Sequence, residues 1–358
     1  MPTITSPTEA DLAIFRRELD GFVPGRVFDA HAHLWARGHV PPGSSPAFES
    51  AAQEVVGLAE YRRQMAALLP GREIAGSLFI PGAVAAQGAD LIAENELVAR
   101  ETAGDGRCRH ALLISPEMDA DFVRAEVRRL RPAALKCYHL RSAARPTWDA
   151  ELPAYLPEAH VRVAHEAGLC VILHLVRPRA LADPANQYWI RRYCEPFPHM
   201  KLILAHAGRG FNPYHTIEGI AALRDLPNLW CDMSAVTEAG ACEAIIEALG
   251  HDRLLYGSDF PVSHLRGRCV AVGDGFVWLY EETLDWKTVS FQPLQPTLVG
   301  LESLRVLKQA AWRCRLSDRQ VEDIFYNNAM RLLSVGREAI HPDLAASLSW
   351  RPSQGAGD

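Results

Sequence analysis

Residues that can bind a metal ion or transfer protons occur in several short apolar segments of the chain. His31 and His33 are separated by one residue in VFDAHAHLW at 27–35. In an extended strand their side chains leave on the same face, which Asp29 shares. Four further segments place such residues at their ends, namely Lys136, His174, His206 and Asp259. Imidazole and carboxylate groups together suit Zn²⁺ or a similar divalent ion, and three protein ligands would leave one position open for water.

Each of these residues also has an ordinary structural interpretation. A single histidine in an apolar strand, such as His174, is commonly a hydrogen-bonded core residue. An aspartate before an aromatic residue and proline, as at Asp259, is commonly a turn residue. The combination favours a site, because four strands would place compatible groups at one end of the same sheet. The sequence therefore predicts a metal site at the strand ends.

The segments that carry these residues belong to a repeating pattern. Eight apolar runs alternate with helical segments, at 27–35, 74–82, 109–117, 133–140, 169–178, 201–210, 229–236 and 254–261. Runs of this length without strict alternation are typical of parallel strands buried on both faces. Eight such strands predict an α/β fold, a closed (β/α)8 TIM barrel. The alternative, a doubly wound open sheet, would want a glycine-rich turn after an early strand, and the first strand has none.

Helix signals lie between these runs. Apolar residues follow helical spacing over 49–69, and Gly168 and Gly250 are placed as helix C-caps. Ser317 and Gln320 have the spacing of a capping box at the start of a closing helix.

The organisation predicted is one barrel with appended segments. We expect a leader at 1–25, a single barrel with the metal site at 26–339 and a loose tail at 340–358. Within the barrel, the loop at 36–48 and the insertion at 262–300 would both lie over the C-terminal mouth, and the insertion is expected to act as a lid. The insertion is rich in aromatic residues: Phe276, Trp278, Tyr280, Trp286 and Phe291.

The composition excludes several classes of protein. The 358 residues are 48% hydrophobic and carry a formal charge of −6, which argues against disorder and against a nucleic-acid-binding protein. No apolar run approaches the roughly 20 residues of a membrane helix, and the N-terminus lacks the pattern of a signal peptide. The eight cysteines form no CxxC pair, and Cys137, Cys170 and Cys231 are expected to be reduced core thiols. We therefore expect a cytoplasmic protein that acts on a small molecule.

In its ordered motifs the chain resembles the metal-dependent amidohydrolase superfamily. These motifs are DAHAHLW near the start, VILHL around His174, LAHAGRG around His206 and YGSDFP around Asp259. The closer resemblance is to the amidohydrolase 2 branch, where strand eight commonly reads GSD followed by an aromatic residue and proline. That branch contains lactonases, related hydrolases and decarboxylases of the aminocarboxymuconate-semialdehyde type. The resemblance covers roughly residues 26–335.

The resemblance implies one divalent metal ion, usually zinc with manganese as the alternative, held by His31, His33, His174 and Asp259. It gives His206 a catalytic or second-metal role. Lys136 lies near the place of a strand-four lysine that is carboxylated and bridges two ions in two-metal members. An unmodified Lys136 would instead bind an anionic substrate or pair with Asp259. Many members of the branch hold one ion and are often dimers, so one ion and a homodimer are the expectations.

The expected reaction is hydrolysis of a small lactone, ester or amide. Asp259 would accept the proton of the attacking water, and His206 would help the metal to polarise the carbonyl group. Arg209 is a candidate to bind a substrate carboxylate through its guanidinium fork. His139 is a second substrate-binding candidate, although strand alternation places its side chain on the face opposite to that of Lys136. The alternative reaction is non-oxidative decarboxylation at the same site, and a non-catalytic barrel is disfavoured because no ligand is missing.

Overall fold

The computed structural model describes residues 4–42, 46–49, 51, 53–82, 88–289 and 294–338. The predicted tail at 340–358 and Phe291 lie outside the described residues.

Eight parallel strands form the predicted barrel. In order around the sheet they are β1 (Arg26–Ala36), β3 (Glu73–Pro81), β4 (Cys108–Leu113), β5 (Ala134–Cys137), β6 (Cys170–Leu173), β7 (Lys201–Leu204), β8 (Leu229–Asp232) and β9 (Leu254–Leu255). The barrel closes beyond β9, where the N–H groups of Ala30 and His33 donate to the carbonyls of Tyr256 and Phe260 at 2.9 and 2.8 Å. All eight strand segments expected from the sequence are confirmed.

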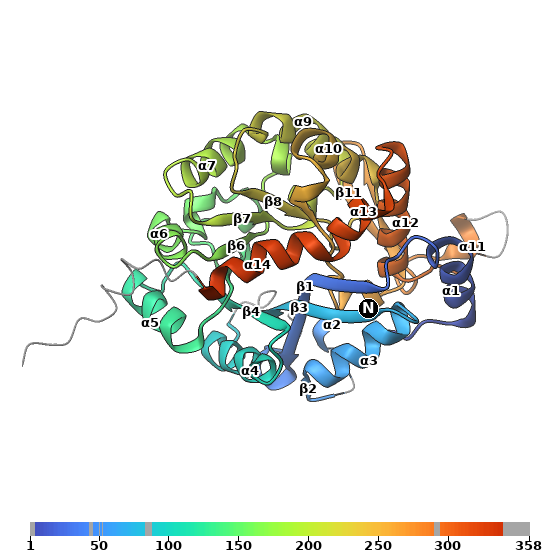
Figure 1. Ribbon diagram of the computed structural model, residues 1–358, viewed down its shortest axis with the longest axis horizontal. Coiled ribbons are helices and arrows are strands. Elements are labelled where there is room, and N and C mark those ends of the chain that lie inside the picture. Colours follow the sequence, from blue (N-terminus) through green and yellow to red (C-terminus); the bar gives the residue numbers. More distant parts are fainter. Residues whose placement is uncertain are drawn as a thin grey trace, which may run out of the picture.

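Helices follow the strands and cover the outside of the barrel (Figure 1). They include α3 (Leu58–Leu68), α4 (Leu91–Ala103), α5 (Ala120–Leu130), α6 (Glu158–Glu166), α7 (Pro184–Cys194), α9 (Pro213–Gly219), α10 (Ala239–Leu249) and α12 (Val299–Arg313). Gly168 and Gly250 follow α6 and α10 with positive φ angles of 64° and 90°, as the C-cap prediction required. The capping box at Ser317 and Gln320 is also confirmed, at the start of α13 (Asp318–Glu322).

The first of these helices is shorter than predicted. The helical spacing over 49–69 was misleading, because α3 begins only at Leu58. Before it, α2 (Pro46–Glu49) is a single turn and β2 (Val55–Val56) pairs antiparallel with Trp35 and Ala36 of β1. Pairing with the extended end of β1 thus overrides the local helical preference.

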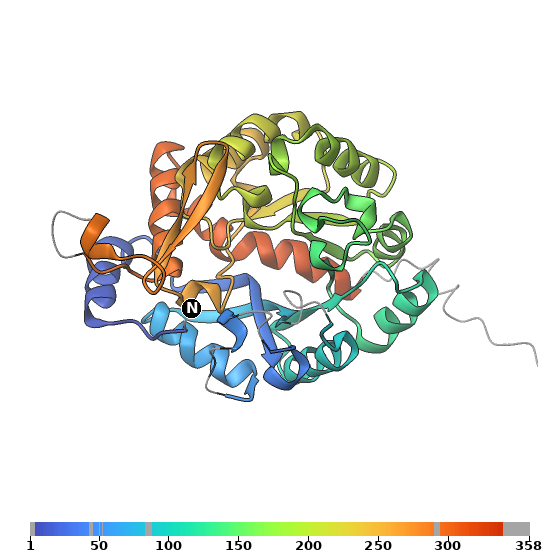
Figure 2. The same cartoon turned by 180° about the vertical axis from the view of Figure 1, so that it is seen from behind.

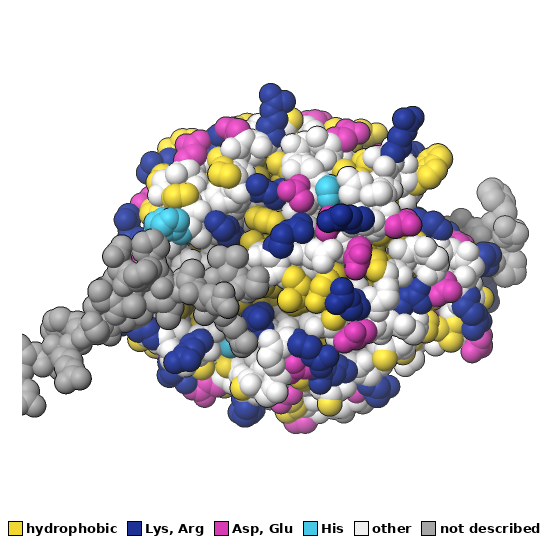
Figure 3. Space-filling model, viewed as in Figure 1, with side chains coloured by type: hydrophobic (Ala, Val, Ile, Leu, Met, Phe, Trp, Pro, Cys, Tyr) yellow, Lys and Arg dark blue, Asp and Glu magenta, His cyan; other side chains and the backbone are white. Residues whose placement is uncertain are grey.

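The N-terminal end of the barrel is closed by α14 (Asn328–Glu338), which crosses it in Figure 1. Inward-facing residues such as Phe28 and Ile80 pack in one cluster with Ala329 and Leu332 of that helix. Figure 3 shows basic and acidic side chains interspersed over the described part of this face. In the described part of the chain, no helix combines the length and apolar character needed to cross a membrane. The opposite end of the barrel is left to carry the site.

The insertion after β9 is a β-hairpin and not a plain loop. Strands β10 (Gly267–Val272) and β11 (Gly275–Tyr280) pair antiparallel, and α11 (Trp286–Val289) follows. Figure 2 shows the hairpin on the side of the barrel opposite to α14. Phe276, Trp278 and Tyr280 alternate along β11 and therefore share one face.

The leader supports the base of this hairpin. It forms α1 (Glu9–Ile14) and a π-helical turn, Phe15–Leu19. Asp11 is buried and accepts hydrogen bonds of 2.6 Å from both Arg266 and Thr297, which lie before and after the hairpin in the sequence. Hydrogen bonds to Asp11 hold its pKa below the ordinary value although burial opposes this. The pairing of Asp11 with Arg266 therefore stays charged at neutral pH.

Candidate active site

The residues predicted to bind the metal ion converge at the open end of the barrel. His31 and His33 come from β1, and His174, His206 and Asp259 directly follow or lie just beyond β6, β7 and β9. Together with Lys136 of β5 they line a cavity of about 340 Å³. The structure therefore brings together all five predicted metal-binding residues and His206.

The donor atoms around Asp259 are spaced as metal ligands. Its Oδ1 lies 3.3 Å from His33 Nε2 and 3.6 Å from His31 Nε2. Ligands bound at 2.0–2.1 Å in a tetrahedron lie about 3.3 Å apart. His33 Nδ1 is buried without a hydrogen-bond partner in the described part of the chain. The donor set therefore fits a divalent ion.

Burial keeps the imidazoles in the form that binds metal. It lowers the pKa of His31 to about 4, lowers the pKa of His33, and lowers that of His174 well below its ordinary value. Burial alone would raise the pKa of Asp259, yet His206 and the two β1 histidines hold it below the ordinary value. Neutral imidazoles and an ionised carboxylate are the species that coordinate zinc.

His206 and Arg209 come from one unusual turn. Residues His206–Arg209, labelled α8, all have left-handed backbone conformations, with φ of 55°, 55°, 70° and 60°. Such conformations are strained for residues other than glycine and are common at functional sites. A hydrogen bond of 2.8 Å from the Thr216 hydroxyl to the Ala207 carbonyl supports the turn. It brings both side chains to the cavity.

The hydrogen bonds of His206 bear on its predicted role. Its Nδ1 lies 2.9 Å from the Ser234 carbonyl oxygen, which can only accept. Nδ1 therefore carries a proton, and Nε2 of the neutral ring has a free lone pair. In a ring with this single proton, Nε2 can accept a proton or bind a metal ion.

Lys136 is buried in β5 and lines the cavity. Burial lowers the pKa of its ammonium group. Among the described residues, no ion pair joins it to Asp259, so the pairing considered from the sequence does not form.

Asp29 does not join the metal ligands, although strand alternation placed it on their face. It accepts hydrogen bonds from the Ser258 hydroxyl at 2.5 Å and from Tyr61 at 2.8 Å. The register of β1 shifts between Asp29 and Ala32, which breaks the alternation. Burial raises the pKa of Asp29 to about 6. Its contact with Ser258 ties β1 to the residue before Asp259.

Asp232 is a residue of the site that sequence reasoning missed. It ends β8, and its Oδ2 lies 2.9 Å from His31 Nδ1. The segment 229–236 was interpreted only as a buried strand. A charged residue within an apolar run, at the same strand end as the other candidates, was the signal that could have identified it.

Arg209 is buried in the wall of the cavity. Its Nη2 donates to the carbonyls of Arg177 and Pro178 at 2.5 and 3.0 Å. Its Nε has no hydrogen-bond partner among the described residues, and none of their carboxylates forms an ion pair with it. Burial lowers its pKa to about 10. The cavity also has aromatic walls: Phe48, Tyr138, Trp148, Phe211, Phe276, Trp278 and Tyr280.

His139 does not line this cavity. Its Nδ1 lies 3.1 Å from the Thr147 hydroxyl, and its ring centroid is 4.2 Å from that of Trp148. As the alternation of side chains along the strand implied, the His139 ring lies behind the cavity wall, where it packs against Trp148. Both His139 and Arg209 contact Trp148, but of these two predicted substrate-binding residues only Arg209 lines the cavity.

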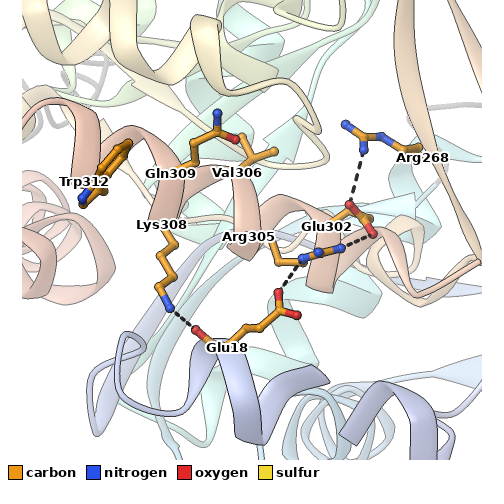
Figure 4. A pocket seen from close by; sticks show the side chains of 8 residues that line it. All are labelled: Glu18, Arg268, Glu302, Arg305, Val306, Lys308, Gln309 and Trp312. Atoms are coloured by element: carbon orange, nitrogen blue, oxygen red, sulfur yellow. Dashed lines mark hydrogen bonds and ion pairs between the residues drawn. The ribbon is translucent and has the colours of Figure 1, made fainter. Parts of the chain in front are cut away.

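A second hollow, of about 440 Å³, lies elsewhere, between α12, the leader and β10 (Figure 4). Its charged side chains pair with one another. Arg305 contacts Glu18 at 2.8 Å and Glu302 at 3.1 Å, and Arg268 contacts Glu302 at 3.7 Å. It contains none of the strand-end residues, so the cavity at the barrel mouth is the candidate site.

Known proteins share sequence or fold with this chain. The family model described as Amidohydrolase (Amidohydro_2) matches residues 28–335. An L-fucono-1,5-lactonase from Burkholderia ambifaria is 31% identical over 145 residues, which are 36% of this chain and 45% of the lactonase, so the match spans less than half of that relative.

Two solved structures share the fold. An amidohydrolase from Burkholderia multivorans with bound zinc is 17% identical, with a TM-score of 0.52 over 86% of this chain and 99% of that one. A dihydroxybenzoic acid decarboxylase from Polaromonas sp. JS666, with bound manganese and the inhibitor 2-nitroresorcinol, is 14% identical, with a TM-score of 0.52 over 88% of this chain and 98% of that one.

Proposed function

The chain belongs to the amidohydrolase family, and on that premise we propose that it hydrolyses a small lactone, ester or amide that carries a carboxylate. One observation carries the proposal. Asp259, whose pKa is held below its ordinary value, lies 3.3 Å from His33 at the open end of the barrel, in the same cavity as a buried arginine, Arg209, that forms no ion pair with a carboxylate of the described residues. The first group can accept a proton from water, and the second can bind an anion.

We propose that one divalent ion, zinc or alternatively manganese, is held by four residues: His31, His33, His174 and Asp259. The zinc and manganese bound in the two solved structures support this choice. When bound, such an ion supplies Lewis-acid activation of water and of a carbonyl oxygen. Lys136 lies in the same cavity wall, and its charge would favour an anionic substrate or transition state there.

Asp259 would act as the proton acceptor and donor. Its low pKa leaves it ionised at neutral pH, so it can accept a proton from the attacking water and deliver it to the leaving group. His206 would assist as an acceptor, because its Nδ1 proton is committed to the Ser234 carbonyl. The expectation that His206 helps to polarise the substrate carbonyl stays a prediction.

Arg209 would bind the substrate carboxylate, and the hairpin β10–β11 would cover the substrate. The guanidinium carbon lies 5.8 Å from the ring centroids of both Trp148 and Phe276, between the wall and the hairpin. An aromatic enclosure excludes water from the reacting groups. The partial likeness to a lactonase favours a lactone among the three substrate classes.

Decarboxylation at the same site is the second candidate. The aromatic walls around Arg209 suit a planar aromatic carboxylate. The decarboxylase from Polaromonas that shares the fold supports this reading.

A substrate panel separates the two reactions. The zinc-loaded protein is incubated with sugar-acid lactones and with aromatic and muconate-type carboxylic acids, and acid and carbon dioxide release are measured. We expect acid release from a lactone, no carbon dioxide, and a loss of at least about 100-fold in Asp259→Asn. Carbon dioxide release alone would establish the second candidate. Undiminished hydrolysis by the variant would contradict the role of Asp259.

A further inference from the structure

We infer that Asp232 is a positioning residue that sets the tautomers of two imidazoles, His31 and His206, before the metal ion binds. The inference rests on the proposed function, because it concerns the same site. It is independent of the substrate and of the reaction that follows.

The carboxylate of Asp232 is fully buried and accepts four hydrogen bonds. Its Oδ2 lies 2.9 Å from His31 Nδ1. Its Oδ1 accepts from the backbone N–H groups of His206 at 3.0 Å and Ser234 at 3.1 Å, and from the Ser234 hydroxyl at 2.5 Å. Three donors on one oxygen leave the other oxygen directed at His31.

The contact with His31 determines which of its nitrogens can bind metal. An ionised carboxylate can only accept, so His31 Nδ1 must carry the proton. The lone pair is then on Nε2, which faces Asp259 Oδ1 at 3.6 Å. A carboxylate that fixes the tautomer of a ligating histidine also raises its basicity as a ligand.

Asp232 acts on His206 by a second route. The Ser234 hydroxyl gives its proton to Asp232, so towards His206 it can only accept. Both the hydroxyl and the carbonyl of Ser234 lie 2.9 Å from His206 Nδ1. Nδ1 of His206 is therefore the donor, and its Nε2 has the free lone pair. The Asp232 carboxylate thus sets the tautomer of His31 directly and acts on that of His206 through Ser234.

The same residues could suggest a second cation site, because ligand atoms of His31, His206 and Asp232 lie within 4.8 Å of one another. The hydrogen bonds argue against it. Both oxygens of Asp232 already accept from donors, and His31 Nδ1 carries a proton where a cation would need a lone pair. The geometry therefore points to positioning and not to ligation.

The decisive experiment reads the tautomers directly. Protein labelled with ¹⁵N-histidine is examined by long-range ¹H–¹⁵N NMR in the metal-free form, and zinc affinity is measured by competition with a chromophoric chelator. We expect His31 and His206 to be protonated at Nδ1 in the metal-free protein. In Asp232→Asn, the three donors from His206 and Ser234 should keep the amide oxygen in the place of Oδ1. The NH₂ group then faces His31 and cannot accept a hydrogen bond from its Nδ1. His31 should then lose the Nδ1–H tautomer, and the zinc Kd should rise about 10–100-fold.

Asp29→Asn is the matched control. It also changes a buried carboxylate that accepts several hydrogen bonds at the same end of the barrel, but among the described residues no imidazole nitrogen hydrogen-bonds to its side chain. It should leave the His31 tautomer unchanged. An Nε2–H tautomer of His31 in the unsubstituted protein would overturn the inference even if Asp232→Asn fails to fold. So would an Asp232→Asn variant with the native zinc Kd. Neither readout uses turnover, so a failure of the proposed hydrolysis would be recognised separately.

Discussion

The guanidinium group of Arg209 is buried, and no carboxylate of the described residues forms an ion pair with it. Burial lowers its pKa to about 10, and its ion-pair partner is missing from the described residues, although two backbone carbonyls accept from its Nη2. A substrate carboxylate would supply that partner through charge-assisted hydrogen bonds. The buried guanidinium thus gives the cavity a preference for anions that its aromatic walls alone would not provide.

Replacing this residue should affect anionic substrates selectively. A charge-assisted hydrogen bond contributes about 1.5–3 kcal/mol, so Arg209→Met should raise KM for a carboxylated substrate about 10–100-fold. Arg209→Lys should restore only part of the loss, because an ammonium group lacks the planar fork. Steady-state kinetics on the acid and on its methyl ester provide the comparison. Equal changes in KM for both would contradict carboxylate binding.

Among the elements around the cavity, the hairpin β10–β11 is fastened to the barrel wall by contacts at its tip. Asp274 lies 3.2 Å from His215 Nε2 and 3.4 Å from Arg179 Nε. The Asn212 amide donates to the carbonyls of Gly273 and Gly275 at 3.2 and 2.9 Å. Phe211 packs beneath, with its ring centroid 5.2 Å from that of Phe276. These contacts hold the aromatic face of β11 over the cavity.

Releasing the tip should loosen the lid without unfolding the barrel. In Asp274→Ala we expect faster amide hydrogen exchange over 267–280 and a KM several-fold higher. The loss of stability should be small, because exposed ion pairs contribute little. Asp252→Ala, at an exposed aspartate just before β9, is the control. Native exchange rates in the Asp274→Ala hairpin would show that Asp274 does not fasten it.

The barrel as a whole was predictable from the sequence, because its strands are apolar runs with turn residues at both ends. The insertion was harder. Gly273-Asp274-Gly275 between alternating residues is a hairpin signal, but residues 262–300 were expected only as an aromatic-rich, lid-like insertion. The beginning of α3 depends on tertiary pairing of Val55 with Ala36, which no local pattern contains.

The site was predictable where residue type and strand end coincide, as at His31 and Asp259. Asp232 was missed because its role arises from three hydrogen-bond donors that meet only in the folded chain. His139 shows the reverse case, since a chemically suitable residue near Lys136 lies behind the cavity wall. Residue type selects candidates, but the register of the strands decides which of them face the cavity.

Buried neutral histidines away from the site should make the fold sensitive to acid. Burial lowers the pKa of His264 to about 4, from an ordinary value of 6.5. The unfolded chain therefore binds a proton near pH 6.5 that the folded chain resists, so stability is complete above pH 6.5 and falls as the pH drops towards 4. At pH 5 the loss from this residue should be about 2 kcal/mol.

Urea unfolding of the metal-free protein at pH 7.5 and pH 5 tests this prediction. His264→Gln should lower stability at pH 7.5, because it disturbs a buried residue that contacts the Gln64 carbonyl. It should also reduce the difference between the two pH values by about 2 kcal/mol. A variant with the full native pH dependence would rule out His264 as a source of the acid sensitivity.

We propose above that the residues at the barrel mouth hold a catalytic divalent ion. Elemental analysis of the purified protein, coupled to chelation and reconstitution, tests this site. We expect close to one zinc or manganese ion per chain, loss of hydrolysis when the ion is removed, and recovery when zinc is restored. Asp259→Asn should bind the ion less tightly. A protein that contains no divalent metal, and whose activity neither zinc nor manganese changes, would contradict the account.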